Sequence, residues 1–391
     1  MEYDFDRITD RGGTGCLKYD FAVQRGRPAD VLPMWVADMD FPTAPCVQEA
    51  LQQMVAHGIF GYSESGAAYF DAVASWFSRR FGFTPEADWL VKTPGVVYAL
   101  AAAVRCLTAP EDAVVILSPV YYPFSEVVRD NGRTLVESCL LYENGTWQID
   151  FADLERKLAE PDVKLLLFCS PHNPVGRVWT RAELEQVSSL CETYDVLIVS
   201  DEIHCDFVWP GHQHIVFPTL SEAATQRTIL CTAPTKTFNL AGLQISNCFI
   251  PNPEIRRRFN EEKNRTGYSQ CGGPGLVACQ AAYEKGEEWL EALKTYIQGN
   301  FEYLQKVLEE DLPQLRLTKA EGTYLAWIDC SGLGLNPEEL ENLILYEARL
   351  WLDSGAMFGS WTAQFQRMNV ACPRTILEQA LQQLRAAVST L

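Results

Sequence analysis

The chain has 391 residues, 47% of them hydrophobic and 21% charged. This is the composition of a folded globular protein, and it excludes a disordered or collagen-like chain. The length predicts two or three domains with a sizeable core. The net charge is −19, from 32 basic and 51 acidic residues. A surface this acidic repels phosphate backbones and anionic lipid, so we expect no nucleic-acid or membrane-surface role.

The sequence also argues against a membrane span, a secretion signal and a disulfide framework. No stretch approaches the roughly 20 apolar residues in a row that a membrane span needs. The first fifteen residues are acidic and lack the basic end and apolar core of a secretion signal, so we expect a cytoplasmic protein. None of the 13 cysteines forms a C-x-x-C pair, and several lie in apolar runs. We therefore expect reduced, buried thiols.

Four short apolar runs predict buried strands, because each is apolar on both faces and ends in small or polar residues. They are residues 113–118, 163–170, 196–200 and 228–232. Between the second and third runs, residues 180–194 have a Thr cap, a Glu three residues later and helical apolar spacing. This alternation predicts an α/β fold in which helices cover both faces of a mostly parallel sheet. Ligands then bind at the carboxyl ends of the strands.

The last third of the sequence reads as a smaller α+β domain. We expect a long helical stretch over 274–312, a strand over 323–329, and helices over 337–347 and 375–390. A helix as long as the first commonly bridges two domains. The predicted organisation is an N-terminal segment packing on the small domain, a large domain and a small C-terminal domain, spanning residues 1–45, 46–285 and 286–391.

Lys236 differs from the other lysines in its surroundings. It follows an apolar strand and is the only charged residue between Thr228 and Pro253. Desolvation lowers the pKa of an amine and makes it a usable nucleophile for a Schiff base. The alternative is a lysine whose stem packs on apolar residues while its amine reaches water.

Three further motifs also stand at junctions between strands and loops. Asp201 follows an apolar strand, and a buried carboxylate there needs a cationic partner such as a protonated pyridine nitrogen; capping of the next turn is the alternative. Asn173 lies between two prolines, and its amide can donate to a phenolate oxygen. The turn at Gly95, Val96 and Val97 opens an apolar helix, whose free N–H groups can bind phosphate.

Together these four features supply what pyridoxal 5'-phosphate (PLP) requires. A lysine holds the aldehyde, an acid holds the ring nitrogen, an amide holds the phenolate and a helix N-terminus holds the phosphate. Each feature alone is weak, since glycine turns before helices are common. Their convergence in one predicted domain indicates a PLP enzyme.

The sequence resembles the fold-type I, class I/II aminotransferase-like PLP enzymes, and within them the MalY/PatB group of cystathionine β-lyases. The similarity covers nearly the whole chain. It is carried by LPMWVADMDF (32–41), FGYSE (60–64), TPGVV (93–97), SPVYYPF (118–124), SPHNPVGRVW (170–179), VSDEIHCDF (199–207), TKTFNLAGLQ (235–244) and FQRMNVACPR (365–374). The segments DEIH and MWVADMDF are specific to this group.

The resemblance implies a role for each matching position. Lys236 resembles the Schiff-base lysine, Asp201 the ring-nitrogen partner, Asn173 the donor to the phenolate, and Gly95, Val96 and Val97 the phosphate turn. Tyr121 matches the aromatic residue that covers the ring face, and Arg367 the arginine that binds the substrate α-carboxylate, a role suited to its bidentate geometry. Trp35 and Val36 lie on the loop beside that carboxylate. Tyr62 matches a tyrosine that reaches the phosphate of a neighbouring subunit, which implies a homodimer with shared sites.

Several positions depart from the pattern or stay open. Ala233 stands where many relatives have a phosphate-binding Ser, and Gln244 where aminotransferases often have Arg. Tyr98 has no assigned role. His204 is either a partner on the phenolate side of the cofactor or a hydrogen-bonded core histidine. His212 and His214 have no third metal ligand nearby, so we expect a loop role and no metal site.

The implied activity is β-elimination from L-cystathionine or related cysteine S-conjugates, which yields a thiol, pyruvate and ammonia. An aminotransferase on the same cofactor frame is the first alternative, because no motif decides between the two reactions. A regulatory protein that binds PLP is the second. The size of the preferred leaving group is not readable, since one methylene in a pocket contributes only about 1–3 kcal/mol.

Overall fold

The computed structural model describes residues 3–391; the first two residues of the predicted N-terminal segment, 1 and 2, lie outside it. Its centre is a seven-stranded sheet in the order β2-β10-β9-β8-β7-β3-β4. The strands are β2 (Leu90–Thr93), β10 (Ser246–Phe249), β9 (Thr228–Thr232), β8 (Leu197–Asp201), β7 (Val163–Cys169), β3 (Ala113–Ser118) and β4 (Thr134–Cys139). All pairings are parallel except those of β10, which is antiparallel to both neighbours. The four predicted strands and the mostly parallel sheet are confirmed.

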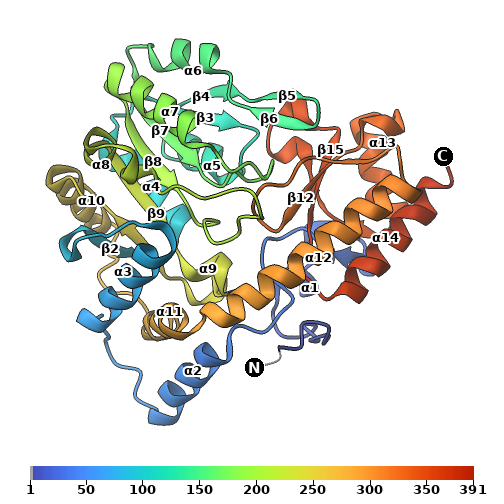
Figure 1. The fold of residues 1–391 in the computed structure, drawn as a ribbon, viewed down its shortest axis with the longest axis horizontal. Helices are drawn as coiled ribbons and strands as arrows, with labels where there is room; N and C mark the ends of the chain where they lie inside the picture. The colour runs from blue at the N-terminus through green and yellow to red at the C-terminus, as the bar shows by residue number, and fades with distance from the viewer. Residues whose placement is uncertain (1–2) are drawn as a thin grey trace.

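Helices cover both faces of this sheet (Figure 1). One face packs on α4 (Val96–Leu107), α5 (Pro123–Asp130) and α10 (Pro253–Arg265). The other packs on α6 (Phe151–Leu158), α7 (Arg181–Thr193) and α8 (Glu222–Arg227). Along β7 the side chains alternate: Leu165 and Leu167 face the first set, whereas Leu166 and Phe168 face the second. A strand buried on both faces is therefore apolar throughout, as its sequence indicates.

The helix between β7 and β8 begins where its sequence predicts. The hydroxyl of Thr180 accepts a hydrogen bond from the backbone N–H of Glu183, and the Glu183 carboxylate accepts one from the N–H of Thr180. This capping box satisfies two N–H groups that the first turn would leave without partners. The predicted start of α7 is confirmed.

The stretch expected as one helix over 274–312 is two helices, so that prediction was wrong in detail. α11 (Gly273–Lys285) ends at Gly286, and α12 (Glu287–Asp311) starts directly after it. A Cβ atom at Gly286 would collide with the Phe238 ring and the Ala282 carbonyl. The close approach of Phe238 thus needs a glycine here, and α12 leaves in a new direction to cross the molecule beside α14 (Arg374–Val388) (Figure 1).

The C-terminal part contains an antiparallel sheet in the order β11-β12-β15-β14. Its strands are β11 (Arg316–Leu317), β12 (Leu325–Asp329), β15 (Phe365–Asn369) and β14 (Asp353–Ser354). The predicted helix over 337–347 is α-helical only in α13 (Pro337–Asn342) and continues as a π-helix over Leu343–Glu347. β1 (Leu32–Pro33) pairs with β13 (Leu350–Trp351), so the N-terminal segment contacts this part. The two boundaries between the three parts, after residues 45 and 285, stay a prediction.

The remaining helices and strands belong to neither the seven-stranded nor the four-stranded sheet. They are α1 (Leu17–Asp20), α2 (Pro45–His57), α3 (Ala67–Phe81), the hairpin β5 (Leu141–Glu143) and β6 (Thr146–Gln148), and the short helix α9 (Pro234–Thr237). α2 and α3 pack on α11. All 13 cysteines are free thiols. Among residues 3–391, no helix is long and apolar enough to cross a membrane.

Candidate active site

A cavity of about 190 Å³ lies at the carboxyl ends of β7, β8 and β9 and at the start of α4. Loops and helix N-termini converge at this edge of a parallel sheet, which is where such folds bind ligands. Eight of the twelve predicted site residues line the cavity: Gly95, Val96, Val97, Tyr121, Asn173, Asp201, His204 and Lys236. The sheet therefore brings together residues that lie up to 141 positions apart in the sequence, from 95 to 236.

Lys236 lies in α9, directly after β9, and its amine faces the cavity. Its Nζ donates a hydrogen bond to the backbone oxygen of Ala37 at 2.7 Å. Burial, and then the positive charge of Arg367, lower the pKa of Lys236 to about 8. A substantial fraction of the amine is therefore neutral near physiological pH, as a nucleophile or a base requires.

Asp201 is the last residue of β8, and its side chain is buried. One carboxylate oxygen accepts a hydrogen bond from the N–H of Ile203 at 3.1 Å. Burial raises the pKa of Asp201 to about 7, although the nearby Lys236 charge opposes the shift. A carboxylate that is this desolvated is stabilised as an anion by a cationic N–H group placed against it.

Asn173 lines the cavity and contacts Arg367, which does not itself line it. The Nη1 atom of Arg367, on β15, donates to Oδ1 of Asn173 at 3.0 Å, which leaves the Asn173 amide nitrogen as a donor. The Nη2 atom of Arg367 donates to the Trp35 carbonyl at 3.0 Å and also pairs with the buried Asp353 carboxylate. Within residues 3–391, the buried Nε of Arg367 has no hydrogen-bond partner. The N–H of Nε is therefore left as a donor for an added acceptor.

Trp35 and Val36 lie on a loop that crosses in front of Arg367 and do not themselves line the cavity. The Trp35 ring stacks on Trp351, with ring centroids 4.4 Å apart. The side chain of Asn369 donates to the carbonyls of Val36, at 2.8 Å, and Asp38, at 2.6 Å. These contacts hold the loop, and sequence reasoning singled out neither Asn369 nor Asp353.

Asn239 fixes the next part of the same loop. Its amide nitrogen donates to the carbonyls of Met39, at 2.9 Å, and Phe41, at 3.0 Å, and its Oδ1 accepts from the Met39 N–H. Both Asn239 and Asn369 stand in motifs that carry the family resemblance. An asparagine that binds backbone leaves no separate sequence signal, however, so only the fold identifies what it does.

The opposite end of the cavity is formed by backbone and neutral side chains. Gly95 is the N-cap residue of α4, and the N–H groups of the first turn lack partners within the helix. Thr235 and Gln244 also line this cavity, whereas Ala233 does not. Among the described lining residues Lys236 is the only cation. An anion bound here would rest on helix N–H groups and neutral donors.

Tyr62 lies away from the cavity that its own chain forms. Its side chain is 98% exposed, and it stands near other exposed apolar residues at the end of α2 and in the loop that follows: Val55, Ile59 and Phe60. The structure of one chain thus gives Tyr62 no contact with the remaining site residues, and its role stays a prediction.

His204 is on the cavity wall and is buried. In the described part of the chain, its Nδ1 has no hydrogen-bond partner. Burial holds the pKa of His204 well below its ordinary value, so the ring is neutral. Of the two roles left open by the sequence, its place on the wall favours a contact with a bound molecule. Tyr98 instead bonds to the hydroxyl of Thr266 at the end of α10.

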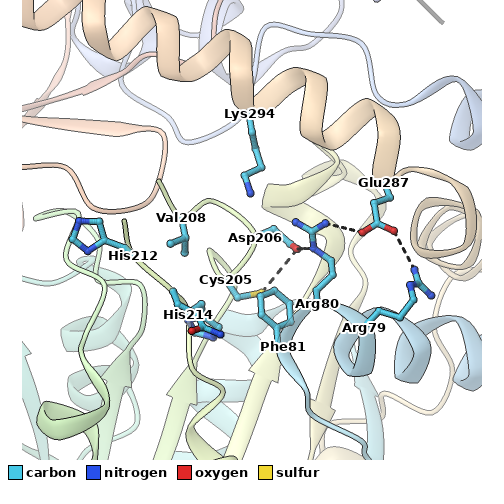
Figure 2. Close-up of a pocket in the computed structure, with 11 residues that line it drawn as sticks. Arg79, Arg80, Phe81, Cys205, Asp206, Val208, His212, His214, Glu287 and Lys294 are labelled. Atoms are coloured by element: carbon cyan, nitrogen blue, oxygen red, sulfur yellow. Dashed lines mark hydrogen bonds and ion pairs between the residues drawn. The ribbon is translucent and has the colours of Figure 1, made fainter. Parts of the chain in front are cut away.

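The histidines of the segment 212–214 lie at a separate hollow of about 370 Å³ between α3, the loop after β8 and α12 (Figure 2). The ring of His214 bonds to the buried Glu202 carboxylate at 2.7 Å, whereas His212 is 3.9 Å from Glu321. Residues 3–391 contain no group of three or more side chains placed to hold a metal ion. Arg80 crosses this hollow and joins Asp206 to Glu287, so ion pairs tie its walls together (Figure 2).

The family model for aminotransferase class I and II matches residues 29–384, so the chain belongs to this family. It is 39% identical over 386 residues to the cystathionine beta-lyase PatB of Bacillus subtilis, covering 99% of this chain and 100% of that protein. It is 35% identical over 388 residues to the protein MalY of Escherichia coli, covering 99% of each. Cystalysin from Treponema denticola, whose crystal structure contains a pyridoxal 5'-phosphate cofactor, matches with a TM-score of 0.96 at 36% identity and full coverage of both chains. The resemblance to the MalY/PatB group and the fold-type I class are confirmed.

Proposed function

We propose that the protein is a PLP-dependent carbon–sulfur β-lyase that cleaves L-cystathionine or related cysteine S-conjugates to a thiol, pyruvate and ammonia. The relatives named cystathionine beta-lyase, which match over 92% or more of this chain, and the cavity at the sheet edge support it. The observation that carries the proposal is that one cavity contains the desolvated amine of Lys236 and the buried carboxylate of Asp201.

The residues of the cavity fit PLP. The Asp201 carboxylate is buried and forms no ion pair within residues 3–391, although the Lys236 charge lies near enough to act on its pKa, and a protonated ring nitrogen would supply a direct partner. Lys236 would hold the aldehyde carbon, and the free amide nitrogen of Asn173 would donate to the phenolate oxygen. Tyr121 would cover a ring face, with His204 on the cavity wall beside it, and the turn at 95–97 would hold the phosphate.

When bound, PLP supplies the electron sink that stabilises negative charge at the substrate Cα. The chain's own residues orient the substrate and move the proton. Arg367, with its unpartnered Nε, would bind the α-carboxylate beside Trp35 and Val36. The neutral amine of Lys236 would remove the Cα proton, which its lowered pKa favours. The thiolate then leaves from Cβ.

The second copy of the chain completes the site in this proposal. Exposed apolar residues surround Tyr62, which has no role within one chain. A homodimer would cover Val55, Ile59 and Phe60 and bring the partner's tyrosine to the phosphate. We also propose a cytoplasmic location, which the 13 free thiols support, because a reducing compartment keeps cysteines unpaired.

An aminotransferase is the second candidate, because the family model is that of aminotransferases. The two reactions differ in whether a 2-oxo acid is needed. The test is pyruvate release from L-cystathionine by the purified, PLP-loaded protein with no 2-oxo acid present. We expect equal amounts of pyruvate, ammonia and thiol over many turnovers. Turnover that begins only after a 2-oxo acid is added would instead make the protein an aminotransferase. No turnover with or without the 2-oxo acid would favour a regulatory PLP-binding protein.

A further inference from the structure

The backbone oxygen of Ala37 accepts two hydrogen bonds from side chains in different parts of the fold. Lys236 Nζ donates to it at 2.7 Å, and the hydroxyl of Tyr324 donates to it at 2.9 Å. Ala37 belongs to the N-terminal loop, Lys236 to α9, and Tyr324 immediately precedes β12 of the C-terminal sheet. Three segments thus meet at one carbonyl beside the cavity.

The Tyr324 hydroxyl is a fixed donor. Its side chain is fully buried, and burial raises the pKa of Tyr324 well above its ordinary value, so it keeps its proton. Its ring packs edge-on against Phe207, at 4.9 Å between centroids, and against His204, at 5.8 Å. These contacts leave the hydroxyl little freedom to turn away from Ala37.

The Ala37 carbonyl is itself held from both sides. Asn369 binds the carbonyls of the preceding Val36 and the following Asp38. The buried Lys18 and the half-buried Arg11 pair with Asp40 a little further along the loop. A carbonyl fixed in this way, with one of its two acceptor positions taken by Tyr324, offers a single remaining direction to the lysine amine.

We propose that Tyr324 is a positioning residue for Lys236. By sharing the Ala37 oxygen, it fixes one N–H of the free amine and so aims the nitrogen lone pair into the cavity. In proton removal, that lone pair takes the Cα proton, the electron pair of the broken C–H bond stays on the substrate, and the amine becomes an ammonium. Tyr324 keeps its own proton throughout. Only the removal of the Cα proton by Lys236 rests on the proposed function; the position of the amine does not.

The first test needs no turnover. Apoprotein is mixed with PLP, and the rate of cofactor capture by Lys236 is followed by absorbance at one fixed pH. Tyr324→Phe is expected to slow capture about tenfold, the scale of a misaligned reacting group. The matched control is Tyr69→Phe, which also removes one buried hydroxyl. The Tyr69 hydroxyl donates a 2.7 Å hydrogen bond to Asn247, and neither residue lines the cavity. Its capture rate is expected to stay within about twofold of wild type.

The second test separates positioning from general damage to the fold. With Cα-deuterated L-cystathionine, Tyr324→Phe is expected to lower kcat about tenfold with little change in KM, and to increase the isotope effect on kcat, because proton removal becomes slower. A merely structural defect would lower kcat through the active fraction and leave the isotope effect unchanged. Should Tyr324→Phe fold poorly, Asn369→Ser releases the carbonyls of Val36 and Asp38 on either side of Ala37, and it is expected to change both readouts in the same direction.

Unchanged capture rate and isotope effect in well-folded Tyr324→Phe would overturn the inference. Absence of pyruvate from the wild-type protein would overturn the proposed function alone, since cofactor capture still reports the position of the amine.

Discussion

The two ends of the cavity are built differently. The end proposed to hold the PLP ring, here called the ring end, consists of Asp201, Asn173 and His204, which are all buried. The end proposed to hold the phosphate, here called the phosphate end, consists of the turn at 95–97 with Thr235 and Gln244, and here Val97 is 41% exposed. One end is enclosed by side chains held at strand ends. The other offers backbone N–H groups and neutral side chains to a group that carries up to two negative charges. In the proposed function the ring end is complete in a single chain, whereas a second copy completes the phosphate end.

Removal of the lysine at the centre of the site has the largest expected effect. Lys236→Ala removes both the anchor for the aldehyde and the base, so pyruvate release should fall by at least about 10³-fold. The matched control is Lys294→Ala on α12, which lines the separate hollow, and it should retain wild-type activity. Near-normal pyruvate release by Lys236→Ala would contradict the assignment.

The ring end is tested by Asp201→Asn, which preserves shape and removes the charge that offsets a protonated ring nitrogen. Activity should fall about 10²- to 10³-fold. The raised pKa of Asp201, about 7, gives a second readout. The native apoprotein holds a proton here that the unfolded chain has lost, so this site lowers stability as pH rises from about 4 to 7. The apoprotein of Asp201→Asn should thus melt higher than wild type at pH 8, and the gap should shrink toward pH 5. An equal gap at both values would show that Asp201 is not desolvated.

The phosphate end is tested by Tyr62→Phe. If Tyr62 donates to the phosphate of the partner subunit, the loss of one hydrogen bond to a charged group should weaken PLP binding about tenfold. The ring end should be unaffected, so kcat at saturating PLP should stay near wild type. Equilibrium dialysis measures the affinity. Unchanged affinity would mean that the phosphate end is complete without Tyr62.

The smallest expected effect is the pH dependence of PLP capture by Lys236. Burial and Arg367 lower the pKa of Lys236 to about 8, and the neutral amine is the reactive form. The rate of PLP capture by apoprotein should rise up to about pH 8 and then level off, whereas an ordinary lysine would continue to gain up to about pH 10.4. A rise that continues past pH 10 would show that the amine is solvated.

The ring end could be predicted from the sequence because its residues directly follow apolar strands. Asp201 ends β8, and Lys236 and Asn173 lie a few residues after β9 and β7. In a parallel sheet, residues that directly follow the strands can lie only at the edge where the carboxyl ends of the strands meet. The need for a glycine at 286, where one helix ends and the next begins, could not be predicted in the same way, since the ring that approaches it belongs to Phe238, 48 residues away.

The contacts that hold the N-terminal loop also could not be predicted from the sequence. Asn239, Asn369 and Tyr324 bind backbone oxygens of residues 36–41, and backbone acceptors are the same at every position. Asp353 likewise stands in no motif that the sequence analysis identified, although it pairs with Arg367 across β14 and β15. A residue that positions another by binding its backbone becomes visible only when the chain is folded.

Subunit complementation tests the central claim, that a β-lyase site takes its ring end from one chain and completes its phosphate end from another. Lys236→Ala lacks the amine, and Tyr62→Asp places a negative charge against the phosphate. After the two variants are mixed, dissociated and reassembled at limiting PLP, each mixed dimer contains one intact Lys236 facing one intact Tyr62. Pyruvate release from L-cystathionine should then recover to about one quarter of the wild-type value, as expected for random pairing in a symmetric dimer. No recovery above the two separate variants would contradict the shared site.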